Sequence, residues 1–433
     1  MKKIAVQTFG CKVNQYETAC SLDKFLDNGY KLVNFSETAD IYLINTCTVT
    51  NRTDYKSRNA IRKALKQKQK YPKTNIIITG CYAQRFPEEI RSIGKIDYII
   101  DNNNKGNIYD IVVGNQKINF NKIEFYHNFG DVFTKTIPDK TRAFIKIQDG
   151  CSYNCSYCAI PFARGKSRSR DKVDILSQIK VLAKNGYKEI ILSGINLGLY
   201  GKDKKNNYSL PDLIMDIEKI KQVEIIRLSS IEPDLFDDSL FRIMKTSKKL
   251  APHFHIPLQS GCDKILAKMK RRYNQKQFKQ LVDKIYKIKP YAALGLDVIV
   301  GFPGESKENF LETKKFLENI KFTYLHLFSY SKRPKTSAAK MKNQVNGNII
   351  KKRNSQLRKL SQQKTRKYSQ KLVENRIILK GIIESKEKGY YTALSDHYMR
   401  VYFQSEQNLQ NKFMKFIPKK NFRDGLVVDR VIT

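Results

Sequence analysis

The stretch GCSYNCSYC, Gly150 to Cys158, places three cysteines, Cys151, Cys155 and Cys158, within eight residues. Their spacing is C-x3-C-x2-C, and no fourth cysteine or histidine lies nearby. A structural zinc site uses four protein ligands, typically paired two and two. Three thiolates suit a [4Fe–4S] cluster better, because they bind three irons and leave the fourth open to another ligand. The stretch therefore predicts an iron–sulfur cluster with one open iron.

The cysteine stretch follows the first of six strand-like runs, which are AFIKIQ, EIILSG, EIIRLSS, HFHIPLQ, LGLDVIVG and YLHLFSY, between residues 143 and 330. Helical patterns such as DILSQIKVLAKNG separate these runs. Six β/α units predict an incomplete (β/α)8 barrel, in which the chemistry lies at the carboxyl ends of the strands. Polar residues and glycines follow several of the strands, so all of them are expected at one mouth.

An earlier region, residues 1–130, repeats another unit. The runs KIAVQTFGC, ADIYLINTC and TNIIITGC end at Cys11, Cys47 and Cys81, which are 36 and 34 residues apart. Helix-like segments fill the gaps, so the pattern predicts βαβ units and a parallel sheet. The three cysteines are then expected at the carboxyl ends of parallel strands, where open α/β sheets bind ligands. We interpret them as a shared metal cluster.

The remainder of the chain changes character twice. Residues 332–371 contain 14 Lys or Arg and no Asp or Glu, partly in a helical pattern, which indicates a phosphate-facing surface. The last 60 or so residues form short β-branched and aromatic runs, which suggest a small β-barrel. We expect an α/β protein with four parts: a parallel-sheet α/β domain (1–130), a six-unit partial barrel (137–331), a basic connector (332–372) and a β-barrel (373–433).

Composition limits the function classes. The 433 residues carry a net charge of +40, which suggests a polyanionic partner such as nucleic acid, although an AT-rich genome would also raise the lysine content. No run approaches the ~18 apolar residues of a membrane span, and the N-terminus lacks the pattern of a signal peptide. We expect a cytoplasmic protein without membrane contact, whose eight cysteines serve metal binding or catalysis rather than disulfides.

Several motifs of the chain resemble those of a known family. CSYNCSYC after a first barrel strand resembles the radical S-adenosylmethionine (SAM) superfamily. TFGCKVNQYET, INTCTVT, TGCYAQ, LSGINLG, PLQSGCDKILAKMKRRY and DVIVGFPGE resemble the methylthiotransferases within it, and GCKVNQYET is most similar to the group that acts on threonylcarbamoyladenosine in tRNA. The tail resembles the RNA-binding TRAM domain. Ser329 and Lys335 depart from the family pattern, where proline and glycine are expected.

The resemblance implies a cofactor set and an activity. Cys151, Cys155 and Cys158 would bind a [4Fe–4S] cluster whose open iron chelates SAM, and Cys11, Cys47 and Cys81 would bind a second [4Fe–4S] cluster for sulfur delivery. The implied reaction adds a methylthio group at C2 of N6-threonylcarbamoyladenosine beside the anticodon of tRNA. It requires a low-potential electron donor such as flavodoxin or ferredoxin, and we expect a monomer.

Further candidate residues follow from their places at strand ends or in basic stretches. The candidates for SAM binding are Tyr157, Ser193, Gly194, Asn196, Ser229, Gln259, Ser260 and Gly301. Those for RNA contact are Arg164, Arg168, Arg170, Lys351, Lys352 and Arg353. His255 could face the barrel mouth or be a satisfied core histidine, and Cys20 and Cys262 are interpreted as packing residues.

Two alternatives stay open. Within the same class of enzyme, the substrate could be isopentenyladenosine in tRNA or a ribosomal protein. In another class, the chain could be an iron–sulfur RNA-binding protein without catalysis, although a binder needs no barrel mouth.

Overall fold

The computed structural model describes residues 1–114, 116, 120, 123, 129–130, 132–138, 140–205 and 207–432, without the side chains of 429–432. Its first part is a parallel sheet with strand order β2-β1-β3-β4-β5. The elements of this part are β1 (Lys3–Thr8), α1 (Lys12–Asp27), β2 (Lys31–Val33), β3 (Ile41–Thr46), α2 (Asn51–Lys70), β4 (Asn75–Gly80), α3 (Cys81–Arg85), α4 (Pro87–Arg91), β5 (Tyr98–Ile99) and α5 (Ile108–Val113). The predicted parallel α/β domain is confirmed.

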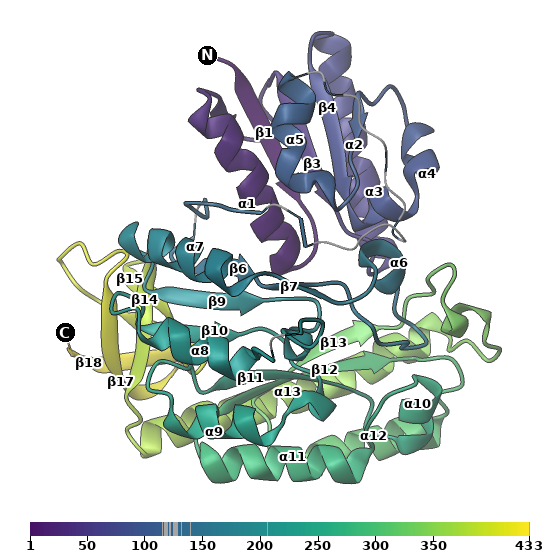
Figure 1. Ribbon diagram of the computed structural model, residues 1–433. Coiled ribbons are helices and arrows are strands. Elements are labelled where there is room, and N and C mark those ends of the chain that lie inside the picture. Colours follow the sequence, from purple (N-terminus) through teal and green to yellow (C-terminus); the bar gives the residue numbers. More distant parts are fainter. Residues whose placement is uncertain are drawn as a thin grey trace.

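The helices of this domain begin where the sequence supplies caps. Thr50 accepts a hydrogen bond from the amide of Thr53, and the Thr53 hydroxyl accepts one from the amide of Thr50, so two free amides at the start of α2 are satisfied. Strands β3 and β4 are buried along nearly their whole length, because helices cover both faces of the sheet (Figure 1). The central strands therefore hold the residues that follow them at fixed positions.

The second part contains the six predicted β/α units. Its elements are β6 (Ala143–Lys146), β7 (Gln148–Asp149), α6 (Pro161–Arg164), β8 (Arg168–Ser169), α7 (Lys172–Lys184), β9 (Glu189–Ser193), α8 (Leu210–Glu218), β10 (Ile225–Leu228), α9 (Asp238–Thr246), β11 (His253–Gln259), α10 (Asp263–Lys268), α11 (Gln275–Ile288), β12 (Ala293–Val300), α12 (Lys307–Asn319) and β13 (Tyr324–Ser329). The six long strands are parallel, in two sheets of order β10-β9-β6 and β11-β12-β13.

The arc of strands is less continuous than the sequence suggests. Strands β10 and β11 do not pair as a ladder: an isolated bridge joins Ile226 of β10 to Leu250, which precedes β11, and the amide of Ile231 donates to the carbonyl oxygen of His255. Strands β6 and β13 are the outer edges of the arc, so the partial barrel is open on one side. The first domain covers the top of this arc (Figure 1).

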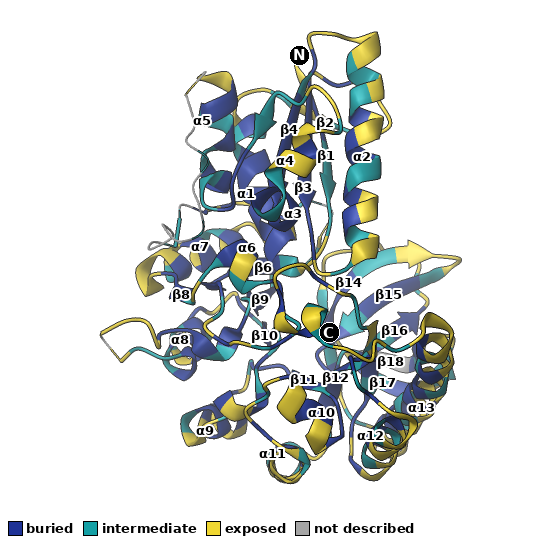
Figure 2. Cartoon of the chain, turned by 90° about the vertical axis from the view of Figure 1, so that its right-hand side faces the viewer, coloured by how far each residue is buried: buried dark blue, intermediate teal, exposed yellow. Residues whose placement is uncertain are grey.

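The chain ends in a long helix and a closed barrel. Helix α13 (Gly347–Glu374) lies against β13, and its buried face includes Leu357, Leu360 and Leu372. The barrel has the order β14-β15-β16-β18-β17 and consists of β14 (Leu379–Glu387), β15 (Tyr390–Ser395), β16 (Arg400–Phe403), β17 (Phe413–Phe422) and β18 (Gly425–Ile432). It has its own apolar core, to which Tyr368 and Leu372 of α13 contribute. The small β-barrel predicted for the tail is confirmed. Figure 2 shows the exposed outer surface of α13 beside the buried strands.

Among the described residues, no helix is long and apolar enough to cross a membrane.

Candidate active site

Three cysteines lie at the carboxyl edge of the first sheet, as the sequence predicts. Cys11 follows β1, Cys47 follows β3 and Cys81 begins α3 directly after β4, so they end three neighbouring strands. Cys47 and Cys81 are buried and Cys11 is exposed. We call these residues the edge cysteines.

Glycines let the chain approach itself closely at the edge cysteines. Gly80 has a φ of +102°, and a Cβ there would lie 2.2 Å from the carbonyl oxygen of Thr46. Gly10 has a φ of +101°, and a Cβ there would lie 2.8 Å from Cys47 Sγ. Any larger residue would clash at either position and strain the backbone, so both glycines are needed to bring the cysteine loops together.

A network of buried charges lies between the edge cysteines and the second domain. Arg164 of α6 is fully buried and donates to Glu17 of α1, with Nη1–Oε1 at 2.8 Å and Nη2–Oε2 at 3.0 Å. Arg164 also donates to Asp149 Oδ1 at 2.9 Å, and Lys146 and Lys105 pair with the same Glu17 carboxylate. The network combines two carboxylates with four cations, which are Lys105, Lys146, Arg164 and Arg168. Within the described part of the chain, Glu17 and Asp149 each pair with three of these cations.

The loop from Gly150 to Cys158 holds the second trio, which we call the loop cysteines. All three are partly buried. Hydrogen-bond donors face two of the sulfurs: the amide of Tyr153 lies 3.4 Å and Asn196 Nδ2 lies 4.0 Å from Cys151 Sγ, and Arg271 Nη1 lies 3.1 Å from Cys155 Sγ. Donors aimed at sulfur stabilise thiolates, so the loop is suited to hold a metal cluster.

Burial alone would keep the cysteine thiols protonated. It raises the pKa of Cys158 to about 12, and burial together with the neighbouring Cys81 raises the pKa of Cys47 to about 12. The charge of Arg164 opposes the rise at Cys47. Because metal ligation needs thiolates, a cluster at either trio must displace these protons on binding.

One predicted SAM-binding residue, Asn196, contacts a loop cysteine, and Gly194, Ser229 and Gln259 lie at the ends of β9, β10 and β11. Buried Asn196 Oδ1 and Ser229 Oγ have no hydrogen-bond partner in the described part of the chain, which is the condition expected of atoms that await a polar ligand. Gly194 lies against Gln148, where a Cβ would come within 2.8 Å of Gln148 Oε1. Gln259 ends β11 with a left-handed φ of +62°. We call Asn196, Ser229, Gly194 and Gln259 the rim residues. Their polar atoms are of the kind that the amino and carboxylate groups of SAM need as partners.

Other predicted SAM-binding residues have structural contacts. The hydroxyl of Ser260 bonds to Thr313 Oγ1 and accepts from the amide of Cys262, and Ser193 is buried within β9. A Cβ at Gly301 would lie 2.4 Å from Ile350, so this glycine admits α13. Tyr157 packs its ring edge against Phe302 and accepts from Arg271 Nη1 at 3.3 Å. These contacts make Ser260 and Gly301 parts of the scaffold.

Sequence reasoning missed two residues beside the loop cysteines. Arg271 contacts Cys155 and forms an ion pair with Glu232, and the side chain of Arg271 is almost fully buried while that of Glu232 is 17% exposed. Burial raises the pKa of Glu232, while Arg271 opposes that rise. The adjacent pair Arg271-Arg272, directly after a helix that leaves a strand end, was the available signal, whereas Glu232 offered none.

Four of the six predicted RNA-contacting residues are buried and have partners within the protein. Arg164 is buried in the network described above, Arg168 is buried beside Asp149, and Arg170 donates to Tyr16 and Gln178. Arg353 is 7% exposed and forms an ion pair with Glu305. Side chains that are already paired inside the protein cannot contact phosphates. Lys351 and Lys352 are exposed on α13 and remain candidates.

Three polar side chains meet on one face of the β11-β12-β13 sheet. His255 Nε2 of β11 lies 2.8 Å from Asp297 Oδ1 of β12, within hydrogen-bonding distance. His326 Nδ1 of β13 lies 3.4 Å from the same oxygen. Burial opposes ionisation of Asp297, but the hydrogen bonds to His255 and His326 lower its pKa to about 2. Both ring nitrogens of His255 have partners, Asp297 and Ser230, and its side chain is partly buried, so it has the contacts of a satisfied histidine.

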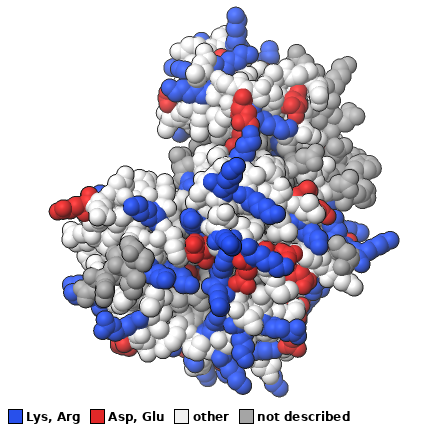
Figure 3. All heavy atoms as spheres, turned by 60° about the vertical axis from the view of Figure 1, so that its left-hand side comes forward, with Lys and Arg blue, Asp and Glu red and all other residues white. Residues whose placement is uncertain are grey.

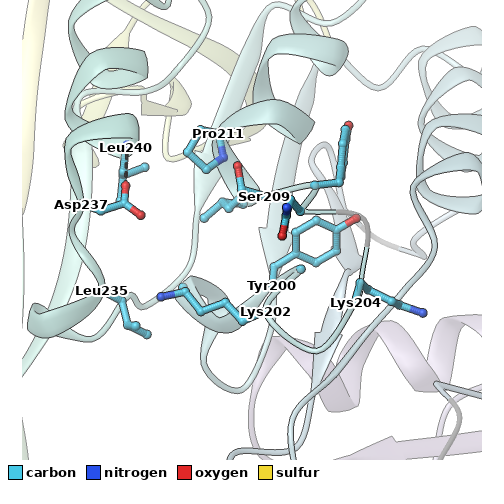
Figure 4. A pocket seen from close by; sticks show the side chains of 13 residues that line it. Tyr200, Lys202, Lys204, Ser209, Pro211, Leu235, Asp237 and Leu240 are labelled. Atoms are coloured by element: carbon cyan, nitrogen blue, oxygen red, sulfur yellow. Dashed lines mark hydrogen bonds between the residues drawn. The ribbon is translucent and has the colours of Figure 1, made fainter.

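A pocket of about 190 Å³ lies apart from the cysteines. Figure 4 shows Asp237 and Leu240 on one side of it and Tyr200 and Ser209 on the other, with Lys202 across its mouth. None of the predicted site residues lines it. The pocket is therefore separate from the candidate active site.

Two family models match the chain. Residues 3–101 match "Uncharacterized protein family UPF0004", and residues 145–317 match the radical SAM superfamily. Among solved structures, the radical SAM methyltransferase TsrM from Kitasatospora setae aligns with a TM-score of 0.58 and 11% identity, over 78% of this chain and 77% of that chain. That likeness concerns the fold. Fold and family model together define a radical SAM enzyme, a class that uses a [4Fe–4S] cluster and SAM.

Curated relatives narrow the class further. The threonylcarbamoyladenosine tRNA methylthiotransferase MtaB of Aquifex aeolicus is 38% identical over 90% of this chain and 97% of its own length, and that of Bacillus subtilis is 39% identical over 96% and 93%. A tRNA-2-methylthio-N(6)-dimethylallyladenosine synthase of Dictyoglomus thermophilum is 33% identical over 96% and 95%. The chain belongs to the methylthiotransferase family of radical SAM enzymes and is a transferase, as its motifs indicate.

Proposed function

We propose that this protein adds a methylthio group at C2 of N6-threonylcarbamoyladenosine in tRNA. The observation that supports the reaction is the presence of two cysteine trios, the edge cysteines and the loop cysteines. Buried Arg164 links the two domains that carry them, because it donates to Glu17 of the first and to Asp149 of the second. Five similar relatives, at 33–39% identity, carry the name of this activity.

The polar barrel face favours this substrate over the dimethylallyl analogue. A threonylcarbamoyl group presents a carboxylate, a hydroxyl and amide groups, which need polar partners when they are enclosed. His255, Asp297 and His326 offer such partners on three adjacent strands. A dimethylallyl group has no polar atom to offer these side chains, so it would gain none of the hydrogen bonds that a threonylcarbamoyl group could form with them.

We assign the edge cysteines to a second [4Fe–4S] cluster. Among the described residues, Lys105, Lys146 and Arg164 share the carboxylates of Glu17 and Asp149, so a further anion near Arg164 would meet positive charge. Thiolates bound to iron supply negative charge beside Arg164, whose charge acts on Cys47. The donor set and the electrostatics therefore both fit an anionic cluster.

The residues of the chain have separate tasks in this mechanism. The loop cysteines hold the first cluster, Arg271 and Asn196 donate toward its sulfurs, and the rim residues orient SAM. When bound, reduced cluster and SAM supply a 5′-deoxyadenosyl radical, which is the chemistry of the cofactor. The first domain lies over the barrel (Figure 1), where it would limit the access of water to the bound cofactor. A low-potential donor such as flavodoxin or ferredoxin would supply the electron, and one chain contains the whole site, so a monomer suffices.

One experiment tests the function and the division of tasks. The protein is reconstituted anaerobically and incubated with SAM, a reductant and tRNA that carries threonylcarbamoyladenosine, and the nucleosides are analysed by mass spectrometry. We expect the methylthio derivative from the wild type. The triple variant Cys11→Ala, Cys47→Ala, Cys81→Ala should form 5′-deoxyadenosine without a methylthiolated product and should contain about half the iron.

The controls separate the alternatives. A tRNA with dimethylallyladenosine and a ribosomal protein fraction serve as rival substrates, and circular dichroism verifies the fold of the triple variant. Absence of 5′-deoxyadenosine from the wild type would favour the non-catalytic iron–sulfur RNA-binding protein. A folded triple variant that still methylthiolates tRNA would reduce the edge cysteines to a structural role.

A further inference from the structure

Three side chains on neighbouring strands meet on the polar face of the partial barrel. His255, Asp297 and His326 come from β11, β12 and β13, and Asp297 and His326 are direct register partners. One nitrogen from each histidine and one carboxylate oxygen all lie within 4.8 Å of one another. Backbone ladders join β11 to β12 and β12 to β13, so the backbone positions of the three residues are set by strand pairing.

These separations suit one metal ion. His255 Nε2 and His326 Nδ1 lie 2.8 and 3.4 Å from Asp297 Oδ1. Two ligands that each lie about 2.1 Å from a tetrahedral ion are separated by roughly 3–3.5 Å. The chain therefore needs only small side-chain movements to place an ion between the three atoms. Two imidazoles with one carboxylate form a ligand set that divalent transition metals prefer.

The surroundings of the two histidines supply the other features of a metal site. Ser230 Oγ lies 2.6 Å from His255 Nδ1, and a hydroxyl can accept the N–H that a ligating imidazole carries on its second nitrogen. The side chain of His326 is 44% exposed, so an ion can enter and retain an open coordination position. Ser230 thus orients the His255 ring, and the exposed side chain of His326 makes the site accessible from solvent.

We propose that His255, Asp297 and His326 bind a divalent transition-metal ion, with Zn²⁺ as the representative ion, and that its open position binds a carboxylate of the substrate. The site is distinct from both cysteine trios, which come from other loops. The identity of the open-position ligand rests on the proposed function, because the threonyl group of that substrate carries a free carboxylate. The rival state is a hydrogen-bonded network in which the two histidines share Asp297 without an ion.

Zinc binding to the reconstituted holoenzyme tests the site without any reference to catalysis. The protein is dialysed anaerobically against graded Zn²⁺ and the bound zinc is measured by plasma mass spectrometry. We expect one zinc per chain in the wild type beyond that of His326→Ala and Asp297→Asn, with at least a tenfold weaker affinity in these variants. Ser230→Ala should weaken binding by about tenfold, as loss of an orienting partner does.

A control variant and a diffraction measurement accompany the zinc titration. Phe328→Ala lies on the same strand and removes a half-exposed side chain without touching the three ligands, so it should bind zinc like the wild type. Anomalous diffraction at the zinc edge shows where the ion lies. Equal zinc in wild type and both ligand variants, or zinc confined to the cysteines, would overturn the site.

A second measurement tests the open position. Affinities are compared for tRNA with threonylcarbamoyladenosine and for the same tRNA with plain adenosine, with and without Zn²⁺. We expect zinc to favour the modified tRNA in the wild type and not in His326→Ala. A zinc-loaded wild type that binds both tRNAs equally would overturn the carboxylate ligand while leaving the ion site in place. The mass of the product reports on the proposed function separately.

Discussion

At the scale of single residues, Arg164 shows how much a side chain's partners decide its role. The sequence RGKSRSR resembles a surface for phosphates, yet Arg164 is fully buried and bonds to Glu17, Asp149 and Asn14. Glu17 lies 147 positions earlier in the chain. No local pattern discloses such a partner, so the sequence could predict the charge of Arg164 and not its burial. Its guanidinium joins the first domain to the second.

We expect Arg164→Met to destabilise the protein by about 3–5 kcal/mol, because it leaves buried carboxylates with fewer partners. Anaerobic urea unfolding measures the loss. Lys166→Met is the matched control, since Lys166 lies two residues away and is exposed, and it should unfold like the wild type. An unchanged unfolding midpoint for Arg164→Met together with weaker tRNA binding would restore the RNA-contacting role.

At the scale of elements, the strands explain why the cysteines were predictable. The edge cysteines follow parallel strands, and parallel strands end at one edge of a sheet, so sequence spacing alone brings them together. The boundary between β10 and β11 was not predictable, because a continuous arc depends on strand lengths that periodicity does not resolve. Helix α13 is intermediate: its basic composition was recognisable, but which of its cations face solvent depends on its contact with β13.

The exposed cations of α13 define its outer surface. They are Lys351, Lys352, Arg358, Lys359, Arg366, Lys367 and Lys371. Lysines and arginines also spread over the face seen in Figure 3, with acidic residues in smaller groups. The overall positive charge of the protein could therefore bind tRNA without a special role for α13. An experiment must separate the effect of net charge from that of the α13 surface.

Changing Lys351, Lys352, Arg358 and Lys359 to Gln should weaken tRNA binding and flatten its log–log salt dependence by roughly 3. The slope falls because the variant forms fewer phosphate contacts and therefore releases fewer counterions when it binds tRNA. Filter binding over a range of salt concentrations measures both quantities. The matched control removes four exposed cations from α2, Arg62, Lys63, Lys66 and Lys70, and should change the slope little. Equal effects of the two quadruple variants would show that only net charge matters.

At the scale of the whole molecule, the C-terminal barrel is fastened to the base of the partial barrel. Arg227 of β10 is fully buried and donates to Glu189 Oε1 at 2.6 Å and to the carbonyl oxygens of Ser395 and Asp396 at 3.0 and 3.1 Å. Tyr398 stacks on His253 with ring centroids 4.2 Å apart, and on Tyr324 at 5.4 Å. The C-terminal barrel thus packs against one end of the catalytic domain. Sequence patterns predicted this small β-barrel but not its attachment.

This attachment predicts that damage to the junction reaches the catalytic domain. Tyr398→Ala removes two aromatic stacks and should cost about 2 kcal/mol, since each such pair contributes about 0.5–1.5 kcal/mol beyond the buried area. Hydrogen exchange of backbone amides should then accelerate in β11 and β13, whose residues His253 and Tyr324 lose a partner, while α2 stays as in the wild type. Tyr390→Ala is the matched control, because Tyr390 stacks on Tyr402 and Phe422 within the barrel itself. It should accelerate exchange in the barrel strands alone. If Tyr398→Ala leaves β11 and β13 as protected as Tyr390→Ala does, the barrel is an independent module whose contacts with the catalytic domain carry no stability.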